Sequence, residues 1–197
     1  MNLKRLTALL LAICLLGGCL LLPGCKKKKK PAPASSGAAE ASSSVGRQSV
    51  QAGETAPDFT VTLVNGSTVS LSDCAGKVLL LYFFSESEAE SVRGMEAVQK
   101  LATAFFWEDV VVLPIDLYDS AARCKELLGN NSFTAKIGLD ALDDGSVFKS
   151  FRVQYLPATI LVDREGIIRD VLFGITDEES YINHYSDQIG KYLEAAQ

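Results

Sequence analysis

Residues 78–84 are VLLLYFF, an apolar run that is short, unbroken and followed at once by the polar residues SESEAES at 85–91. A strand with one solvent-facing side would alternate apolar and polar residues. This run therefore predicts a strand that is buried on both faces, as in a parallel sheet covered by helices. Residues 92–106 are amphipathic and predict a helix. The chain thus contains a buried strand that leads into a helix through an acidic, serine-rich junction.

The N-terminus has the parts of a secretory signal. A basic start is followed by an apolar run at 6–22 and by small residues before two cysteines, Cys19 and Cys25. The region resembles the precursors of bacterial lipoproteins, and we expect residues 1–25 to be a signal peptide ending in a lipidated cysteine. Polar residues follow Cys25 at once, whereas leucines follow Cys19, so Cys25 is the expected lipid site and Cys19 the alternative. An uncleaved transmembrane anchor is a second alternative, because the run approaches the roughly 20 residues that a span needs.

Residues 26–50 predict a linker. Lysines occupy positions 26–30, and the stretch that follows is rich in proline, alanine, serine and glycine, so it cannot bury enough apolar surface to fold. The lysines either help to hold the linker at an anionic membrane or serve only as a solvated spacer.

We expect one domain over residues 51–197. From residue 49 onward the chain has 11 basic and 23 acidic residues, a net charge of −12. Such a surface disfavours nucleic acid and anionic lipid as partners of the domain.

The order of the other expected elements predicts an α/β sandwich. Asn65-Gly66 joins two alternating runs, which is a strong hairpin signal. A strand at 110–115 contains Pro114, which predicts a sheet edge or a bulge. Further strands are expected at 134–139, 159–162 and 167–172, the last two as a second hairpin, and helices at 119–128, 146–152 and 177–195.

Several short motifs resemble the extracytoplasmic TlpA/ResA-type and AhpC/TSA (redoxin) group of thioredoxin-like proteins. They are, in chain order, Ala56-Pro57-Asp58-Phe59, Val69-Ser70-Leu71-Ser72-Asp73, Gly76-Lys77, the segment 78–95, Val153 to Thr159, and Leu161-Val162-Asp163-Arg164-Glu165-Gly166. The resemblance implies a thioredoxin-like fold, a central mixed β-sheet flanked by helices, with an N-terminal β-hairpin extension.

The redox motif of that group is missing from this chain. Aligned on the flanking residues, the two cysteines of its CxxC motif fall on Glu88 and Ser91, and no cysteine lies between Cys74 and Cys124. Disulfide exchange needs a thiolate, so the group's activity does not transfer. Ser85-x-x-Glu88 and Ser87-x-x-Glu90 both have the pattern of a capping box at a helix N-terminus. The alternative is that the glutamates form an anionic mouth that binds a cation or a basic peptide.

The resemblance also predicts a cis-proline at Pro157, flanked by Leu156 and Ala158. In relatives this loop faces the CxxC, and the backbone before the proline binds an incoming extended polypeptide, which requires no thiol. The alternative is a turn that only the fold requires.

Cys74 and Cys124 are open to three interpretations: buried free thiols, a structural disulfide, or a redox-active pair. His184, on the C-terminal helix, is expected at the surface, and we expect no metal site and no cofactor.

These features predict a membrane-anchored, extracytoplasmic lipoprotein of the cell envelope. We expect a redox-inactive binding or accessory module in protein maturation or redox assembly, with another envelope protein or a peptide as partner and no nucleic acid. The alternatives are a thiol-disulfide oxidoreductase or peroxiredoxin-like enzyme that uses Cys74 and Cys124, and a mainly structural envelope component. Whether the chain is an enzyme stays open at this point.

Overall fold

A computed structural model describes residues 49–118, 120–131, 136–175 and 177–195. The predicted signal peptide, both candidate lipidation sites and nearly all of the predicted linker lie outside these residues. Within them, no helix is long and apolar enough to cross a membrane.

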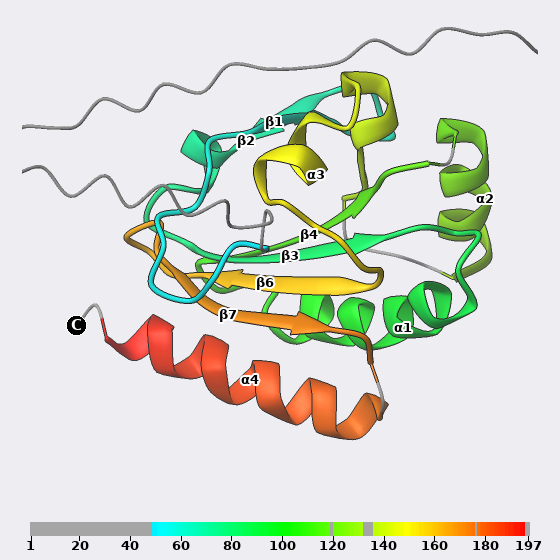
Figure 1. The fold of residues 1–197 in the computed structure, drawn as a ribbon. Helices are drawn as coiled ribbons and strands as arrows, with labels where there is room; N and C mark the ends of the chain where they lie inside the picture. The colour runs from blue at the N-terminus through cyan, green and yellow to red at the C-terminus, as the bar shows by residue number, and fades with distance from the viewer. Residues whose placement is uncertain (1–48, 119, 132–135, 176, 196–197) are drawn as a thin grey trace, which may run out of the picture. The chain divides into compact units, whose positions relative to one another are not determined.

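The core of the fold is a five-stranded mixed sheet with the order β5-β4-β3-β6-β7 (Figure 1). β3 runs parallel to β4 and antiparallel to β6, and β7 pairs antiparallel with β6. A separate two-stranded hairpin precedes the sheet. The strands are β1 (Thr60–Thr62), β2 (Thr68–Ser70), β3 (Val78–Phe84), β4 (Val110–Asp116), β5 (Gly138–Leu139), β6 (Ala158–Val162) and β7 (Ile168–Phe173).

The central strand β3 is buried on both faces, as the sequence predicts. Its side chains alternate between two separate apolar clusters. One cluster lies under the β1–β2 hairpin and α3, and the other lies under α1, α2 and α4. Figure 1 shows this layering, with α1 and α4 on one face of the sheet. The helices are η1 (Leu71–Cys74), α1 (Ala89–Ala104), α2 (Ala121–Asn131), η2 (Asp140–Asp143), α3 (Ser146–Ser150) and α4 (Glu178–Glu194).

The prediction that Pro114 marks a sheet edge or a bulge was wrong. β4 lies between β3 and β5, and Pro114 pairs in regular register with Tyr82. The physical reason is that β5 pairs with β4 only at Ile115 and Asp116. Pro114 lies just outside that short ladder, so it need not donate a hydrogen bond on the β5 side.

Candidate functional site

The residues that the sequence singles out meet at one end of the sheet. β3 and β4 are parallel, so their carboxyl ends lie together, and Phe83 near the end of β3 pairs with Ala158 at the start of β6. The α1 N-terminus, the segment after β4 and the loop before β6 therefore share this end, which we call the loop end. A pocket of about 560 Å³ links α1 to the segment after β7 at this end, because Glu90 and Gly94 line it together with Gly174 and Ile175.

Helix α1 begins at Ala89 with Glu88 as its N-cap, and the Glu88 side chain makes no capping hydrogen bond. The predicted capping boxes were therefore wrong, because they would place the N-cap at Ser85 or Ser87. Instead the Glu88 backbone N–H donates to the Ser85 carbonyl at 3.1 Å. The Ser87 N–H donates to Ser85 Oγ at 3.2 Å, which also closes the junction, and the Glu88 carboxylate is left exposed.

The two positions aligned with the missing cysteines differ in burial. Glu88 is exposed, whereas Ser91 is fully buried. The Tyr82 hydroxyl donates to the Ser91 carbonyl at 2.8 Å, and this buried bond fixes the first turns of α1 on β3. Burial raises the pKa of Tyr82 far above its usual range, so its hydroxyl stays protonated and serves as a donor.

An ion pair partly neutralises the acidic junction. Arg123 of α2 donates to both carboxylate oxygens of Glu86, at 2.6 Å and 3.1 Å, and the Glu86 side chain is only 18% exposed. A paired carboxylate at the junction limits the anionic character expected for this mouth. Sequence reasoning missed Arg123, because a contact across 37 residues leaves no local pattern.

The Leu156–Pro157 peptide bond is cis, as the resemblance predicts. The Pro157 carbonyl accepts from the Gly174 N–H at 2.8 Å, which ties the loop to the end of β7. Ala158 is buried and starts β6. Within the described residues, the Leu156 N–H and C=O make no hydrogen bond. The loop therefore offers a backbone donor and acceptor to an incoming chain.

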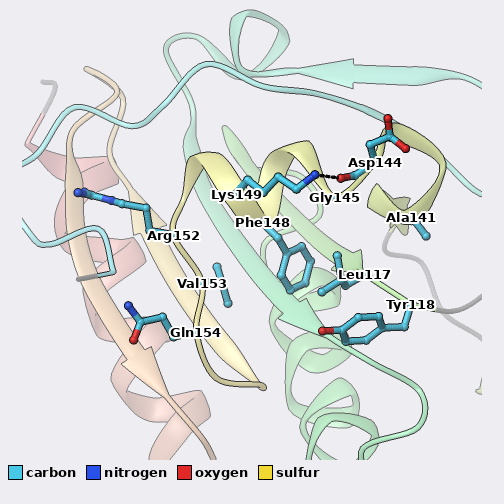
Figure 2. Close-up of a pocket in the computed structure, with 10 residues that line it drawn as sticks. All are labelled: Leu117, Tyr118, Ala141, Asp144, Gly145, Phe148, Lys149, Arg152, Val153 and Gln154. Atoms are coloured by element: carbon cyan, nitrogen blue, oxygen red, sulfur yellow. Dashed lines mark hydrogen bonds between the residues drawn. The ribbon is translucent and has the colours of Figure 1, made fainter. Parts of the chain in front are cut away.

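A pocket of about 580 Å³ lies beside this loop (Figure 2). The segment after β4, the η2–α3 turn, α3 and the residues leading to the cis-proline form its walls, and sequence reasoning gave no sign of it. Its lining residues are Leu117, Tyr118, Ala141, Asp144, Gly145, Phe148, Lys149, Arg152, Val153 and Gln154.

Cys74 and Cys124 are buried, and no disulfide joins them. Cys74 belongs to the cluster under α3, and Cys124 belongs to the cluster on the other face of the sheet. The structural disulfide that the sequence left open is therefore not formed in this structure. Burial raises the pKa of the Cys74 thiol despite the nearby Lys77 ammonium, so this thiol is held in its unreactive form.

His184 is exposed on α4, as expected, and its Nε2 lies 2.7 Å from Asp170 Oδ2. Across the described parts of the chain, no group of three or more histidine, cysteine, aspartate or glutamate side chains could hold a metal ion. The loop end thus combines free backbone groups, exposed aromatic rings and charged side chains. This arrangement can bind a polypeptide. Cys124, the residue after Arg123 on α2, is fully buried.

Comparisons with known proteins agree with this architecture. The model of the AhpC/TSA family matches residues 52–171. The thiol-disulfide oxidoreductase ResA of Geobacillus kaustophilus (strain HTA426) is 26% identical over 138 residues, covering 70% of this chain and 78% of that protein. The thioredoxin-like protein YneN of Bacillus subtilis (strain 168) is 26% identical over 126 residues, covering 64% of this chain and 73% of that protein.

Solved structures show the same fold. The thiol:disulfide interchange protein DsbE from Chlorobium tepidum superposes with a TM-score of 0.66 at 21% identity, covering 74% of this chain and 99% of that one. A protein disulfide isomerase from Bacteroides thetaiotaomicron gives a TM-score of 0.65 at 28% identity, covering 74% of this chain and 91% of that one. The thioredoxin-like fold predicted from the sequence is confirmed.

Proposed function

The chain belongs to the AhpC/TSA family, and from that premise we propose that it is a redox-inactive member that binds polypeptides in the cell envelope. It resembles thiol-disulfide oxidoreductases in fold and sequence. At the positions aligned with their cysteines it carries Glu88 and Ser91 instead. A carboxylate and a hydroxyl cannot exchange with a disulfide, so the role that remains for the site is binding.

The observation that carries the proposal is the unpaired backbone of Leu156, at the same end of the sheet as the α1 N-terminus. An extended polypeptide can add to such a segment through main-chain hydrogen bonds. Tyr155, which is 68% exposed and packs edge-to-face on Phe173 at 6.2 Å, adds an apolar surface next to these groups. Both features act without a thiol.

Photo-crosslinking on the full chain in its own envelope tests this function. A photoreactive phenylalanine analogue replaces Tyr155 at the loop end, and the matched control places it at Trp107, which is 90% exposed and precedes β4 at the opposite end of the sheet. We expect discrete protein adducts from position 155 and none of the same adducts from position 107. Identical adduct patterns at both positions, or no adduct at 155, would contradict a binding role for the loop.

The competing function, an enzyme that uses Cys74 and Cys124, has a separate test. Maleimide labelling of the native chain, mapped by mass spectrometry, should leave both thiols unmodified until the chain is unfolded, because both are buried. Rapid labelling of either native thiol, or an interconvertible disulfide between them, would favour the enzyme.

We further propose that a lipid on Cys25 anchors the protein outside the cytoplasm, with Cys19 as the alternative site. Labelled palmitate should be incorporated in the Cys19→Ala variant and lost in the Cys25→Ala variant. The opposite result would move the anchor to Cys19, and incorporation in neither parent nor variants would remove it.

A further inference from the structure

We propose that the pocket beside the cis-proline loop receives a bulky apolar side chain of the bound polypeptide, and that its basic rim selects a carboxylate next to that side chain. This inference rests on the proposed polypeptide-binding function and specifies the partner: an extended segment with an apolar residue followed closely by an acidic one. The argument depends on the pocket's apolar floor, on its charge and on its continuity with the loop.

The floor of the pocket is apolar and firmly held. Phe148 is 6% exposed and packs edge-to-face on Phe83 at 4.9 Å, which holds its ring against the core. Leu117 and Val153 are partly buried and belong to the same cluster. Figure 2 shows these three side chains in the middle of the group. Lys149 lies above them and points toward Asp144, Arg152 lies at the left, and Tyr118 lies at the lower right. The volume of about 580 Å³ is ample for an aromatic side chain.

The rim is basic although the domain is acidic. Lys149 and Arg152 are two of the 11 basic residues after residue 48, where 23 residues are acidic, and Asp144 is the single carboxylate among the lining residues. Lys149 donates to the backbone carbonyl of Asp144, and no described carboxylate forms an ion pair with it. A carboxylate-bearing partner is repelled by most of this surface and attracted here.

Arg152 provides a second cation whose existing partner is easily exchanged. It forms an ion pair with Glu54 in which the two side chains are 36% and 43% exposed. Ion pairs in such water-accessible positions are weak. A ligand carboxylate at the rim can therefore share Arg152 without a large loss elsewhere.

The pocket and the loop are parts of one continuous segment. Val153 and Gln154 line the pocket, and Leu156, with its free backbone groups, follows two residues later. An extended chain advances about 3.3 Å per residue, so a polypeptide held at Leu156 reaches the pocket within a few residues. The Val153 N–H donates to the Phe148 carbonyl at 3.1 Å, which fixes this segment before any ligand arrives.

Calorimetric titration of the full chain in detergent with synthetic peptides tests the inference. The parent probe is a capped, thiol-free hexapeptide of alanines with one phenylalanine followed by one glutamate. We expect about a tenfold or greater loss of affinity when alanine replaces the phenylalanine, because the buried apolar surface is lost. We expect a loss of about threefold or more when lysine replaces the glutamate.

Variants of the protein locate the effect. Ala141→Trp, at an exposed wall position, should block the pocket and weaken the parent probe about tenfold or more. Lys149→Glu should weaken the glutamate probe and strengthen the lysine probe, a reversal that a merely destabilised protein would not show. The matched controls, Ala122→Trp and Lys125→Glu on the exposed surface of α2, should leave both probes nearly unchanged.

The outcomes separate this inference from the function on which it rests. If all probes bind equally well to the parent and to Ala141→Trp but bind poorly to Pro157→Ala, the loop binds peptides and the pocket inference is wrong. If no probe binds and position 155 gives no crosslink, the polypeptide-binding function itself fails. If the affinity depends on the phenylalanine and the glutamate of the probe and on Lys149 of the protein, the result supports both the pocket inference and the polypeptide-binding function.

Discussion

At Gly94, helix α1 approaches β3 more closely than any side chain would allow. A Cβ at this position would lie 2.2 Å from the Tyr82 hydroxyl oxygen and 2.4 Å from Ile175 Cδ1. We expect Gly94→Ala to push α1 away, break the bond from Tyr82 to the Ser91 carbonyl and lower the free energy of unfolding by about 1–3 kcal/mol. Urea denaturation measures this loss.

Gly190 in α4 is the matched control for Gly94, because a Cβ added at this position would meet no atom within 4 Å. Alanine there should raise the free energy of unfolding by up to about 1 kcal/mol through its better helix propensity. Equal stability of the two alanine variants would show that α1 is not packed tightly at Gly94.

Asp163 makes the free energy of unfolding of the domain depend on pH. Burial opposes its ionisation, but the hydrogen bonds from the Ile167 and Glu165 N–H groups and the Arg169 guanidinium outweigh it and hold the pKa below its usual range. The ionised carboxylate therefore stabilises the fold at neutral pH, and this contribution is lost as the pH falls from about 4 through the folded-state pKa. Asp163→Asn should be less stable than the parent at pH 7, and the difference should shrink on acidification.

Asp140 should show the opposite trend, because burial raises its pKa although the Phe148 and Val147 N–H groups donate to it. Its protonated form favours folding, so the stability of the parent relative to Asp140→Asn should increase as the pH falls. Denaturant titrations of both variants between about pH 7 and pH 3 give the two slopes. Parallel slopes would contradict the opposite pKa directions of the two carboxyl groups.

At the scale of an element, the α1 N-terminus carries Glu88 and Ser91 at the two positions that the sequence resemblance aligns with a CxxC motif. Glu88 is exposed and Ser91 is buried. A cysteine at position 88 would therefore be accessible to a substrate, and a cysteine at position 91 would be shielded from solvent. A helix N-terminus lowers the pKa of a cysteine placed there. We expect the double variant Glu88→Cys, Ser91→Cys to form a disulfide and to catalyse the reduction of insulin by dithiothreitol, whereas the parent protein should give only the background rate.

A second double variant, Ser87→Cys with Glu90→Cys, has the same spacing one residue earlier and serves as the control. Because it shifts the pair around the helix, it should be much less active. If the control matches the first variant, or if neither exceeds the parent, the alignment of the missing motif on Glu88 and Ser91 is wrong.

The elements that the sequence predicted correctly depend on local signals. Asn65-Gly66 predicts the first hairpin, and the apolar run 78–84 predicts the doubly buried strand, because turn chemistry and burial periodicity are contained in a few neighbouring residues. The start of α1 could not be predicted this way. Two serine-glutamate patterns offered equivalent N-caps, and the helix instead begins after Glu88, where long-range contacts such as the Tyr82–Ser91 bond hold it.

The candidate site was only partly predictable for the same reason. The cis-proline followed from a motif that resembles a known family, whereas the neighbouring pocket requires Leu117 and Phe148 to meet across the fold. The ion pair between Glu86 and Arg123 is likewise a tertiary contact. No spacing rule within the sequence connects such residues.

Across the whole domain, the two ends of the sheet have different relations to the family. The motif residues at the end opposite the loop end support one another: Arg164 donates to the Gly76 carbonyl at 2.8 Å, and the Asp163 carboxylate closes the β6–β7 turn. These contacts hold the fold and need no thiol. The loop end holds Glu88 and Ser91, the positions that the sequence resemblance aligns with the redox motif.

Charge is also unevenly distributed along the whole chain, and this leads to a test of membrane attachment. Residues 1–48 carry eight basic residues and one acidic residue, whereas the remainder has a net charge of −12. Each lysine near an anionic membrane surface contributes roughly 1 kcal/mol, so the run Lys26–Lys30 should bind such a surface without any lipid anchor.

The chain beginning at Lys26 should sediment with vesicles rich in phosphatidylserine and be released as the ionic strength rises, because salt screens the attraction. The chain beginning at Ser49, and a variant with glutamine at all five lysine positions, should stay in solution at every lipid composition. Binding by the chain from Ser49 would show that the acidic domain itself contacts the membrane, and the lysine run would then have no specific part in attachment.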